Sequence, residues 1–577
     1  MLKLFKNMRG VALVFCILAP LFMVLEVMMD LMQPTTMANI INVGVANLDL
    51  DYVTSEGFKM MLYAFIGLIG GAGCSICASV AGTLLGRNIR GALFNKIQGM
   101  SFAEIDRFKA GSLITRLTND TMQIQNVTTM GLKLMVRAPF LCIGGVVMAC
   151  TLSIDLAVIL LFAVPIVFLV LIVVMKGAFP LFRKMQQKVD NVNNVVRENL
   201  QGVRVVKSFN MEDDQKRRFD AANADLLDNS VKSANRVMTL MPIINFVVNA
   251  SVIAVFWYGG FLAGTNNDLA GNISAFVMYL TQILGSLMTV VMMGMTITRA
   301  KAAADRINEV MDSESSIKEK EQTVSPTTFE MAFNNVSFRY YDTGEEYALK
   351  NLNFTIAAGE KIGVIGSTGS GKSTMIALMA RLYDVTDGAI TIGGVDVRDM
   401  SLKELRKNVG IVLQEKILLS GSVRDNIKYA DGTMSDEEMQ KAAKAAMAEP
   451  FITEMGDNYD HFVEQQGRNF SGGQKQRLSI ARTLAMRPKV LIFDDATSAL
   501  DTKTEKELFE NMGEYVDGNT FILVAQRISS VMNMDRIMVL DGGEITGFGT
   551  HSELLRTNET YREIAVSQLG EGVLENV

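Results

Sequence analysis

Six long apolar stretches in the first half of the chain constrain its fold more than any other feature. They cover approximately residues 11–32, 60–85, 138–152, 156–175, 240–261 and 273–297, the third being the shortest. Most of them are long enough to cross the ~30 Å hydrocarbon core of a bilayer as a helix. With 577 residues, 49% of them hydrophobic, the chain is also too long for one domain and too apolar for an ordinary soluble protein. We therefore predict an α-helical polytopic membrane domain with six transmembrane helices.

The distribution of Lys and Arg predicts which ends of these helices face the cytoplasm. Residues 31–58, 153–155 and 262–272 contain neither Lys nor Arg, whereas residues 87–137 and 176–236 are rich in both. By the positive-inside rule, the N-terminus, the two long loops and everything after the sixth stretch are then cytoplasmic. The net charge of −6 and the lack of an unexplained Lys/Arg run give no reason to expect a nucleic-acid partner.

A glycine-rich segment in the second half of the chain has the pattern of a phosphate-binding loop. It consists of Gly366, Ser367, Thr368, Gly369, Ser370, Gly371, Lys372 and Ser373, followed by Thr374. The glycines allow backbone N–H groups to converge on the β- and γ-phosphates, while the Lys supplies a point charge and the last Ser a hydroxyl for Mg²⁺. We predict a buried strand at 361–365 and a helix at 374–380, the context that such a loop requires. An accidental glycine-rich turn is the alternative.

Two further segments add to this site. A short apolar run at 490–493 ends in Asp494, as in a central parallel strand that delivers a carboxylate to the Mg²⁺ shell. The alternative is a buried strand with a solvated acidic end. The second segment precedes a predicted helix, whose first N–H groups can bind a γ-phosphate. It consists of Phe470, Ser471, Gly472, Gly473 and Gln474.

In this order, the phosphate loop, residues 470–474 and the Asp494 strand resemble the motifs of the ATP-binding cassette (ABC) family. With the membrane half, the resemblance covers essentially all 577 residues. It implies an α/β P-loop cassette fused to the membrane domain, as in half-transporters of bacterial exporters in the plasma membrane. It also implies a dimer, because in the family the signature at 470–474 closes over the nucleotide held by a second cassette and not over that of its own Lys372.

The resemblance also assigns roles to individual residues. ATP and Mg²⁺ are the implied cofactors, with Ser373, Gln414 and Asp494 around the metal ion. Asp501, at the end of 498–501, resembles the D-loop aspartate. Tyr340 stands where the family stacks an aromatic ring on adenine, and Tyr341 is the alternative for that role. An ordinary edge-strand tyrosine is the other interpretation of this position.

Two positions depart from the pattern of an active ATPase. Asp495 stands where the family has a glutamate acting as catalytic base, and Gln526 stands where it has a switch histidine. Aspartate is one methylene shorter, so it should not reach the attacking water, and glutamine cannot become a cation. The pattern resembles one half of a heterodimeric exporter, with a degenerate ATP site on this chain and an intact signature for its partner's competent site. A homodimer with slow hydrolysis at both sites is the alternative.

The composition suggests where the domains meet. We predict a transmembrane domain at 1–312, a polar linker at 313–327 and the cassette at 328–577. The two long cytoplasmic loops are too long for simple connectors and have helical periodicity. In exporters of this family such loops end in coupling helices that press on the cassettes, and residues 101–106 resemble the first, whereas 209–219 lie where the second should be. A solvated helical hairpin is the alternative.

These features favour an ATP-driven efflux pump for lipophilic compounds, although lipids and short peptides fit the same apolar cavity. An importer of exporter-like fold, for a siderophore for example, and a nucleotide-gated membrane switch are the competing functions. Glu26 and Asp30 lie toward the outer end of the first apolar stretch, as functional acids or at a water-exposed rim. Methionines in the last stretch either line the cavity or simply pack; they are Met278, Met288, Met292, Met293 and Met295.

Overall fold

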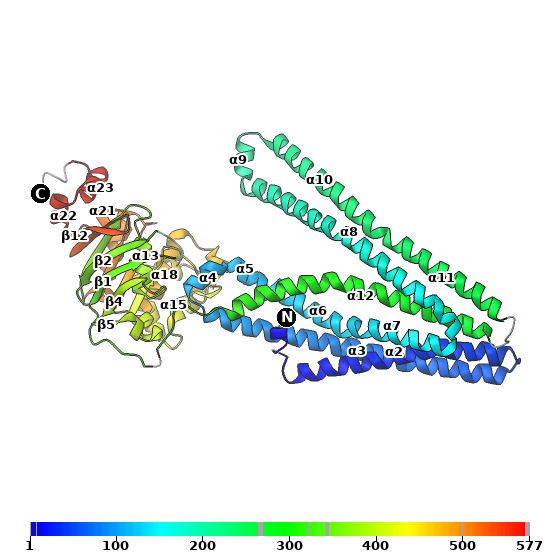
Figure 1. The fold of residues 1–577 in the computed structure, drawn as a ribbon. Helices are drawn as coiled ribbons and strands as arrows, with labels where there is room; N and C mark the ends of the chain where they lie inside the picture. Colours follow the sequence, from blue (N-terminus) through cyan, green and yellow to red (C-terminus); the bar gives the residue numbers. More distant parts are fainter. Residues whose placement is uncertain are drawn as a thin grey trace. The chain divides into compact units, whose positions relative to one another are not determined.

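The computed structural model divides the chain into two compact units (Figure 1). It describes residues 2–6, 8–263, 269–320, 322–340, 346–498 and 500–571. One unit contains residues 1–98 and 110–313, and the other contains residues 99–109 and 314–577. A short piece of the first long loop therefore belongs to the same unit as the C-terminal domain.

In its described residues, the first unit forms helices and no strand. Its helices are α1 (Leu2–Phe5), α2 (Val11–Asn39), α3 (Leu50–Gln98), α5 (Ala110–Thr115), α6 (Thr121–Met130), α7 (Val136–Leu152), α8 (Ile154–Gln201), α9 (Val203–Ser208), α10 (Glu212–Met238), α11 (Leu240–Ala263) and α12 (Leu269–Asp312). Three π-helical segments, η1 (Ile40–Val45), η2 (Arg116–Asp120) and η3 (Gly131–Met135), continue or join them.

The predicted membrane helices are confirmed. Six helical segments among the described residues are long and apolar enough to span a bilayer, namely 11–45, 50–98, 110–152, 154–201, 212–262 and 270–289. The third, which the sequence left shortest, is extended by the preceding helical residues to 43 residues. Small residues permit close packing of the first two helices: a Cβ on Gly70 of α3 would lie 2.9 Å from the backbone nitrogen of Glu26 in α2.

Helices α8 and α10 run side by side as a long arm, and the short helix α9 lies at its tip (Figure 1). We expected the second coupling helix at 209–219, but the short tip helix ends at Ser208 and α10 begins at Glu212. The difference has a local cause, because Glu212, Asp213 and Asp214 form an acidic first turn that favours the start of a new helix.

The second unit contains an α/β domain together with α4 (Phe102–Phe108). Its strands are β1 (Met331–Phe338), β2 (Leu349–Ile356), β3 (Lys361–Gly366), β4 (Asp387–Ile392), β5 (Val395–Asp396), β6 (Val409–Val412), β7 (Gly421–Ser422), β8 (Phe462–Val463), β9 (Val490–Asp494), β10 (Thr520–Val524), β11 (Arg536–Asp541) and β12 (Glu544–Gly549). Its main helices are α13 (Lys372–Met379), α14 (Leu402–Asn408), α15 (Val423–Ile427), α16 (Asp436–Ala445), α17 (Glu449–Thr453), α18 (Gly472–Ala485), α19 (Thr502–Asn511), α20 (Gly513–Val516), α21 (Ile528–Val531), α22 (His551–Thr557) and α23 (Glu559–Leu569). Short 3₁₀ turns η4 (Val397–Asp399), η5 (Lys428–Ala430), η6 (Asn458–Asp460) and η7 (Gln465–Gly467) complete it.

The central sheet has six strands in the order β12-β11-β3-β10-β9-β6. All neighbouring pairs are parallel except β11 with β12. The core strands β9 and β10 are fully buried, as expected for strands covered on both faces. A four-stranded antiparallel sheet, β2-β1-β4-β5, packs its apolar side into one of the two hydrophobic cores of this domain. Parallel order brings the carboxyl ends of β3, β9 and β10 to the same edge, where the predicted motifs follow.

Candidate nucleotide-binding site

The phosphate loop connects β3 to α13, as the sequence predicts. Gly371 has a φ of 101°, a conformation that L side chains rarely adopt, and a Cβ there would also meet Leu349. The ammonium group of Lys372 donates to the carbonyl oxygens of Gly366 at 2.9 Å and Ser367 at 2.7 Å. Burial lowers the pKa of Lys372, while Asp494 and Asp495 act in the opposite direction and favour its charged form. The loop therefore holds a cation at the start of a helix, which suits an anionic phosphate chain.

The loop lines one pocket of about 330 Å³ together with most of the predicted site residues. The lining includes Tyr340, Thr368, Gly369, Gly371, Lys372, Ser373, Thr374, Gln414, Asp494, Asp495 and Gln526. The alternative adenine-stacking residue, Tyr341, lies outside the described residues. Segments separated by almost 190 residues in the sequence, from Tyr340 to Gln526, thus meet at one edge of the central sheet.

Some residues that line this pocket have side-chain oxygens that could serve as ligands for Mg²⁺. The hydroxyl of Ser373 donates to Asp494 Oδ1 at 3.2 Å, and the side-chain amide of Gln414 lines the same pocket. Burial raises the pKa of Asp494, and so does Asp495, whereas the Ser373 hydrogen bond and Lys372 lower it. A hydroxyl, a carboxylate and an amide oxygen are the hard ligands that Mg²⁺ prefers. These residues fit the ion, which would neutralise phosphate charge when bound with nucleotide.

The two departures from the family pattern contact each other. Strands β9 and β10 are parallel with Val524 opposite Asp494, so the residues that follow these strands are neighbours. The backbone N–H of Asp495 donates to Val524 O at 3.0 Å, and the Gln526 amide donates to Asp495 Oδ2 at 2.9 Å. Burial raises the pKa of Asp495, and the Gln526 hydrogen bond opposes this shift. Asp495 also has a φ of 50°, a left-handed conformation that aspartate tolerates better than most residues.

The position expected to bind adenine is built from aromatic rings. Tyr340 contacts Phe338 and Tyr383 edge-on, with ring centroids 4.9 Å and 5.4 Å away, and its hydroxyl lies 2.8 Å from Thr374 Oγ1. Tyr340 is 45% exposed, so a flat base has access to this residue. Sequence analysis missed Tyr383, although its position shortly after α13 is a usable signal.

The signature residues lie elsewhere in the domain. Ser471 is the N-cap of α18, where its hydroxyl accepts from the N–H of Gln474 at 3.3 Å. Ser471 and Gly472 are exposed, whereas Phe470 is buried against Phe451 and His461. None of residues 470–474, all of which are described, is among those that line the phosphate-loop pocket. This placement leaves the helix N-terminus open to a ligand that this chain's Lys372 does not hold.

Asp501 is not among the residues that line the pocket, whereas Lys416 interacts electrostatically with Asp495. Asp501 is exposed and caps α19, accepting from the N–H of Thr504 at 3.1 Å. Lys416 was missed by sequence analysis: burial lowers its pKa, and Asp495 acts in the opposite direction. It therefore adds positive charge on the Asp495 side of the pocket.

The two acidic residues of α2, Glu26 and Asp30, form ion pairs with an arginine. The guanidinium of Arg137 forms ion pairs with Glu26 and, at 3.0 Å, with Asp30. Sequence analysis counted Arg137 in a cytoplasmic loop, but it belongs to α7 and pairs with residues of α2. Among the methionines of α12, Met293 is buried and Met278 is 38% exposed, whereas the side chains of Met292 and Met295 lie outside the described part.

Together, these observations define a P-loop nucleotide-binding domain fused to a six-helix membrane domain. The family description "ABC transporter transmembrane region" matches residues 16–287, and "ABC transporter" matches residues 349–498. An uncharacterized ABC transporter ATP-binding protein of Bacillus subtilis, YfiB, is 36% identical over 569 residues, covering 99% of this chain and 98% of its own length.

Two other similar proteins have more specific descriptions. An ATP-dependent lipid A-core flippase of Syntrophus aciditrophicus is 32% identical and covers 85% of this chain and 82% of itself. The solved structure of a bacterial Atm1-family ABC exporter with ATP bound has a TM-score of 0.80 at 25% identity, covering 96% of this chain and 98% of that one. The chain therefore belongs to the ABC transporters. It is an exporter-type half-transporter that couples ATP hydrolysis to transport and uses ATP and Mg²⁺.

Proposed function

We propose that this chain is the degenerate-site half of a heterodimeric exporter in a bacterial plasma membrane. Its own site binds ATP and Mg²⁺ but hydrolyses ATP weakly. Its intact signature completes the competent site on the nucleotide of a partner half. The observation that carries this proposal is the direct hydrogen bond from the Gln526 amide to the Asp495 carboxylate, inside a pocket that Lys372, Ser373 and Asp494 also line.

The geometry of that bond supports the weak hydrolysis that we propose. A general base must lie within hydrogen-bond reach of the proton that it takes, and the carboxylate of Asp495 is engaged by Gln526. Aspartate is also one methylene shorter than the family's glutamate. Gln526 can donate a hydrogen bond, but it cannot become a cation or pass on a proton at neutral pH. Nucleotide binding needs neither a general base nor a cationic switch residue. It depends instead on Lys372, Ser373 and Asp494.

The exposure of the signature residues supports the proposal that this chain dimerises with a second half-transporter. Ser471 and Gly472 present an open helix N-terminus, the type of site that binds a phosphate group. The tip of the α8–α10 arm is also apolar and exposed, with Phe209 74% accessible in the single chain. An apolar surface of this kind is typical of a protein interface. Both features are expected to be covered by a second half-transporter, and a homodimer is the alternative to a heterodimer.

The transported compound is proposed only by class. A cavity formed by apolar helices suits lipophilic compounds, and the similar flippase of Syntrophus aciditrophicus is described by its name as acting on lipid A-core. Lipids are therefore included with lipophilic drugs, and short peptides are a further option. The positive-inside pattern places the N-terminus and the cassette in the cytoplasm.

The test is co-expression with a second half-transporter that carries the glutamate and the histidine at these two positions. We expect a stable complex whose ATPase activity exceeds that of this chain alone by at least about 100-fold, the usual contribution of a general base. Equal activity with and without the partner would contradict the heterodimer. Accumulation or depletion of a lipophilic dye in inverted vesicles separates export from import, and no transport against a gradient would favour a nucleotide-gated switch.

A further inference from the structure

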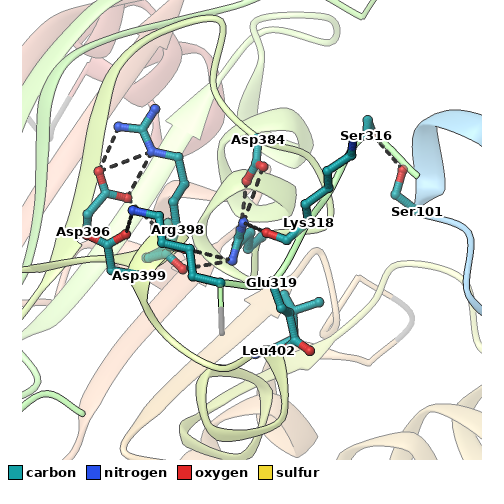
Figure 2. Close-up of polar contacts among 12 residues, drawn as sticks. Ser101, Ser316, Lys318, Glu319, Asp384, Asp396, Arg398, Asp399 and Leu402 are labelled. Carbon is teal, nitrogen blue, oxygen red and sulfur yellow. Dashed lines mark hydrogen bonds and ion pairs between the residues drawn. The ribbon is translucent and has the colours of Figure 1, made fainter. Parts of the chain in front are cut away.

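The linker between α12 and β1 is held against the nucleotide-binding domain over much of its described length (Figure 2). Glu319 accepts a hydrogen bond from the N–H of Leu402, the first residue of α14, at 2.6 Å. Lys320 forms an ion pair with Asp399. The hydroxyl of Ser325 donates to Glu404 at 2.9 Å. A polar linker usually behaves as a mobile tether, and these contacts give it a fixed path instead.

A buried arginine organises this path. Arg381 is only 2% exposed, and its guanidinium donates to the linker carbonyl of Lys318 at 3.2 Å. The same group donates to Asp384 at 2.8 Å and to the carbonyl of Val397 at 3.2 Å. A buried guanidinium is costly unless its donors are satisfied, so this set of acceptors must stay together. The linker is one of them.

Arg381 is also hydrogen-bonded to the phosphate-loop helix. It follows the C-terminus of α13, and its backbone has a φ of 50°. Its N–H donates to the carbonyl of Leu378, inside α13, at 3.0 Å. A left-handed conformation at a non-glycine residue persists only where the surroundings enforce it. The end of α13 and the linker are therefore connected through one side chain.

Two residues before Lys318, the linker contacts α4. The N–H of Ser316 donates to Glu104 Oε1 at 3.0 Å. The hydroxyl of Ser316 lies 2.7 Å from that of Ser101 (Figure 2). The second oxygen of Glu104, Oε2, accepts from the N–H of Ser101 at 2.9 Å and forms the capping box of α4. Both Ser101 and Glu104 are buried. One carboxylate thus caps α4 and binds the linker at the same time.

We propose that Arg381 and Glu104 are positioning residues that use the linker as a latch, so that displacement of α13 by nucleotide reaches α4. This inference rests on the proposed function, in which this chain's own site binds ATP–Mg²⁺. A direct contact, from the Tyr383 hydroxyl to Asp106, also joins α4 to the domain. The latch is a second connection, which reaches α4 through the linker carbonyl of Lys318 and the linker N–H of Ser316.

Glu104→Gln separates the two roles of Glu104. Glutamine still forms a capping box, but it has one acceptor oxygen, so α4 stays capped while the linker contact weakens. The matched control is Ser325→Ala, which removes a linker contact that does not involve α4. The full-length chain is used in the dimer in which it purifies, in lipid nanodiscs. Hydrogen–deuterium exchange of residues 40–50 with and without ATP–Mg²⁺ reports on the membrane domain without a known substrate.

We expect Glu104→Gln to reduce the nucleotide-induced change in exchange at least about threefold, as for one lost hydrogen bond, with ATP affinity within about twofold of wild type. Ser325→Ala should leave both unchanged. Oxidation of a Ser101→Cys, Ser316→Cys pair in the Glu104→Gln chain should restore the response, and a reductant should remove it again. A purely structural role would lower thermal stability without this reversible rescue.

Arg381→Lys tests the other end of the latch, because lysine keeps the charge but lacks the planar fork. It should also weaken the response, yet the Ser101–Ser316 crosslink should not rescue it, since the link to α13 is then the broken one. A normal response in Glu104→Gln, or rescue of both variants by the crosslink, would overturn the latch. A wild-type chain that binds ATP without any change in exchange would also overturn the latch, whereas a chain that does not bind ATP–Mg²⁺ would overturn the proposed function on which the latch rests.

Discussion

The amide nitrogen of Gln526 lies 2.9 Å from Oδ2 of Asp495, so the two residues that depart from the pattern of an active ABC ATPase form a pair. The pair is close because β9 and β10 are parallel and adjacent, with Val524 opposite Asp494. The carboxylate of Asp495, at the position of the family's catalytic base, therefore accepts a hydrogen bond from the neutral amide of Gln526, at the position of the switch histidine. In the same pocket, the residues expected to bind nucleotide keep the family pattern, whereas the two residues expected to act in hydrolysis depart from it.

The first prediction concerns pH. Burial raises the pKa of Asp495, and the Gln526 hydrogen bond lowers it by favouring the carboxylate. Gln526→Ala removes the opposing contribution, so the pKa of Asp495 should rise further. Because only the carboxylate can accept a proton, any residual hydrolysis at this site should then require a higher pH than in the unmodified chain. The measurement is the pH profile of single-turnover hydrolysis at this site, and an unchanged profile would mean that Asp495 is not the group that titrates.

The second prediction concerns the signature. Ser471→Arg should abolish most ATPase activity of the heterodimer, because Ser471 lies on an exposed helix N-terminus away from this chain's own pocket. ATP binding to this chain's own site should be retained. The matched control is Ser435→Arg, which removes the equivalent N-cap of α16 outside the signature. Full ATPase activity in an assembled Ser471→Arg dimer would show that the signature does not serve the partner's site.

The membrane helices and the phosphate loop could be predicted from sequence because their signals are local. Apolar length identifies the spans, and glycine spacing next to an apolar strand identifies the loop. Arg137 illustrates what local signals miss: it was counted with a charged loop, yet it pairs with Glu26 and Asp30 across two helices. That pairing depends on the rotation of α7 against α2, which the composition of neither segment fixes.

In the nucleotide-binding domain, too, motifs could be predicted from local sequence signals, whereas contacts between distant segments could not. The roles expected of Asp495 and Gln526 followed from motif positions, but their contact needed the register of two strands separated by the whole of α19. The boundary of the arm tip was misplaced because the strongly charged residues after 209 are the start of α10. The burial of Arg381 could not be predicted from the sequence, because it results from contacts with the linker and with the η4 turn.

The third prediction tests whether the degeneracy lies only in this chain. Asp495→Glu with Gln526→His restores the family's residues, and it should raise hydrolysis at this site by at least about tenfold. We expect less than full recovery, because an altered signature in the partner would still limit transition-state stabilisation. The rate is measured in a heterodimer whose competent site is silenced by removing the partner's catalytic glutamate. Recovery to the rate of an intact site would show that the partner contributes no second defect.

The central claim is that this chain's own site binds ATP without hydrolysing it efficiently, and one preparation can test both parts. The full-length chain is purified alone into nanodiscs, and ATP–Mg²⁺ binding and phosphate release are measured on the same sample. The account predicts saturable binding that Lys372→Ala abolishes, with turnover at least about 100-fold below that of the complex with a partner half. Robust turnover by the chain alone, lost in Asp495→Ala, would show that Asp495 is a working base and would contradict the account.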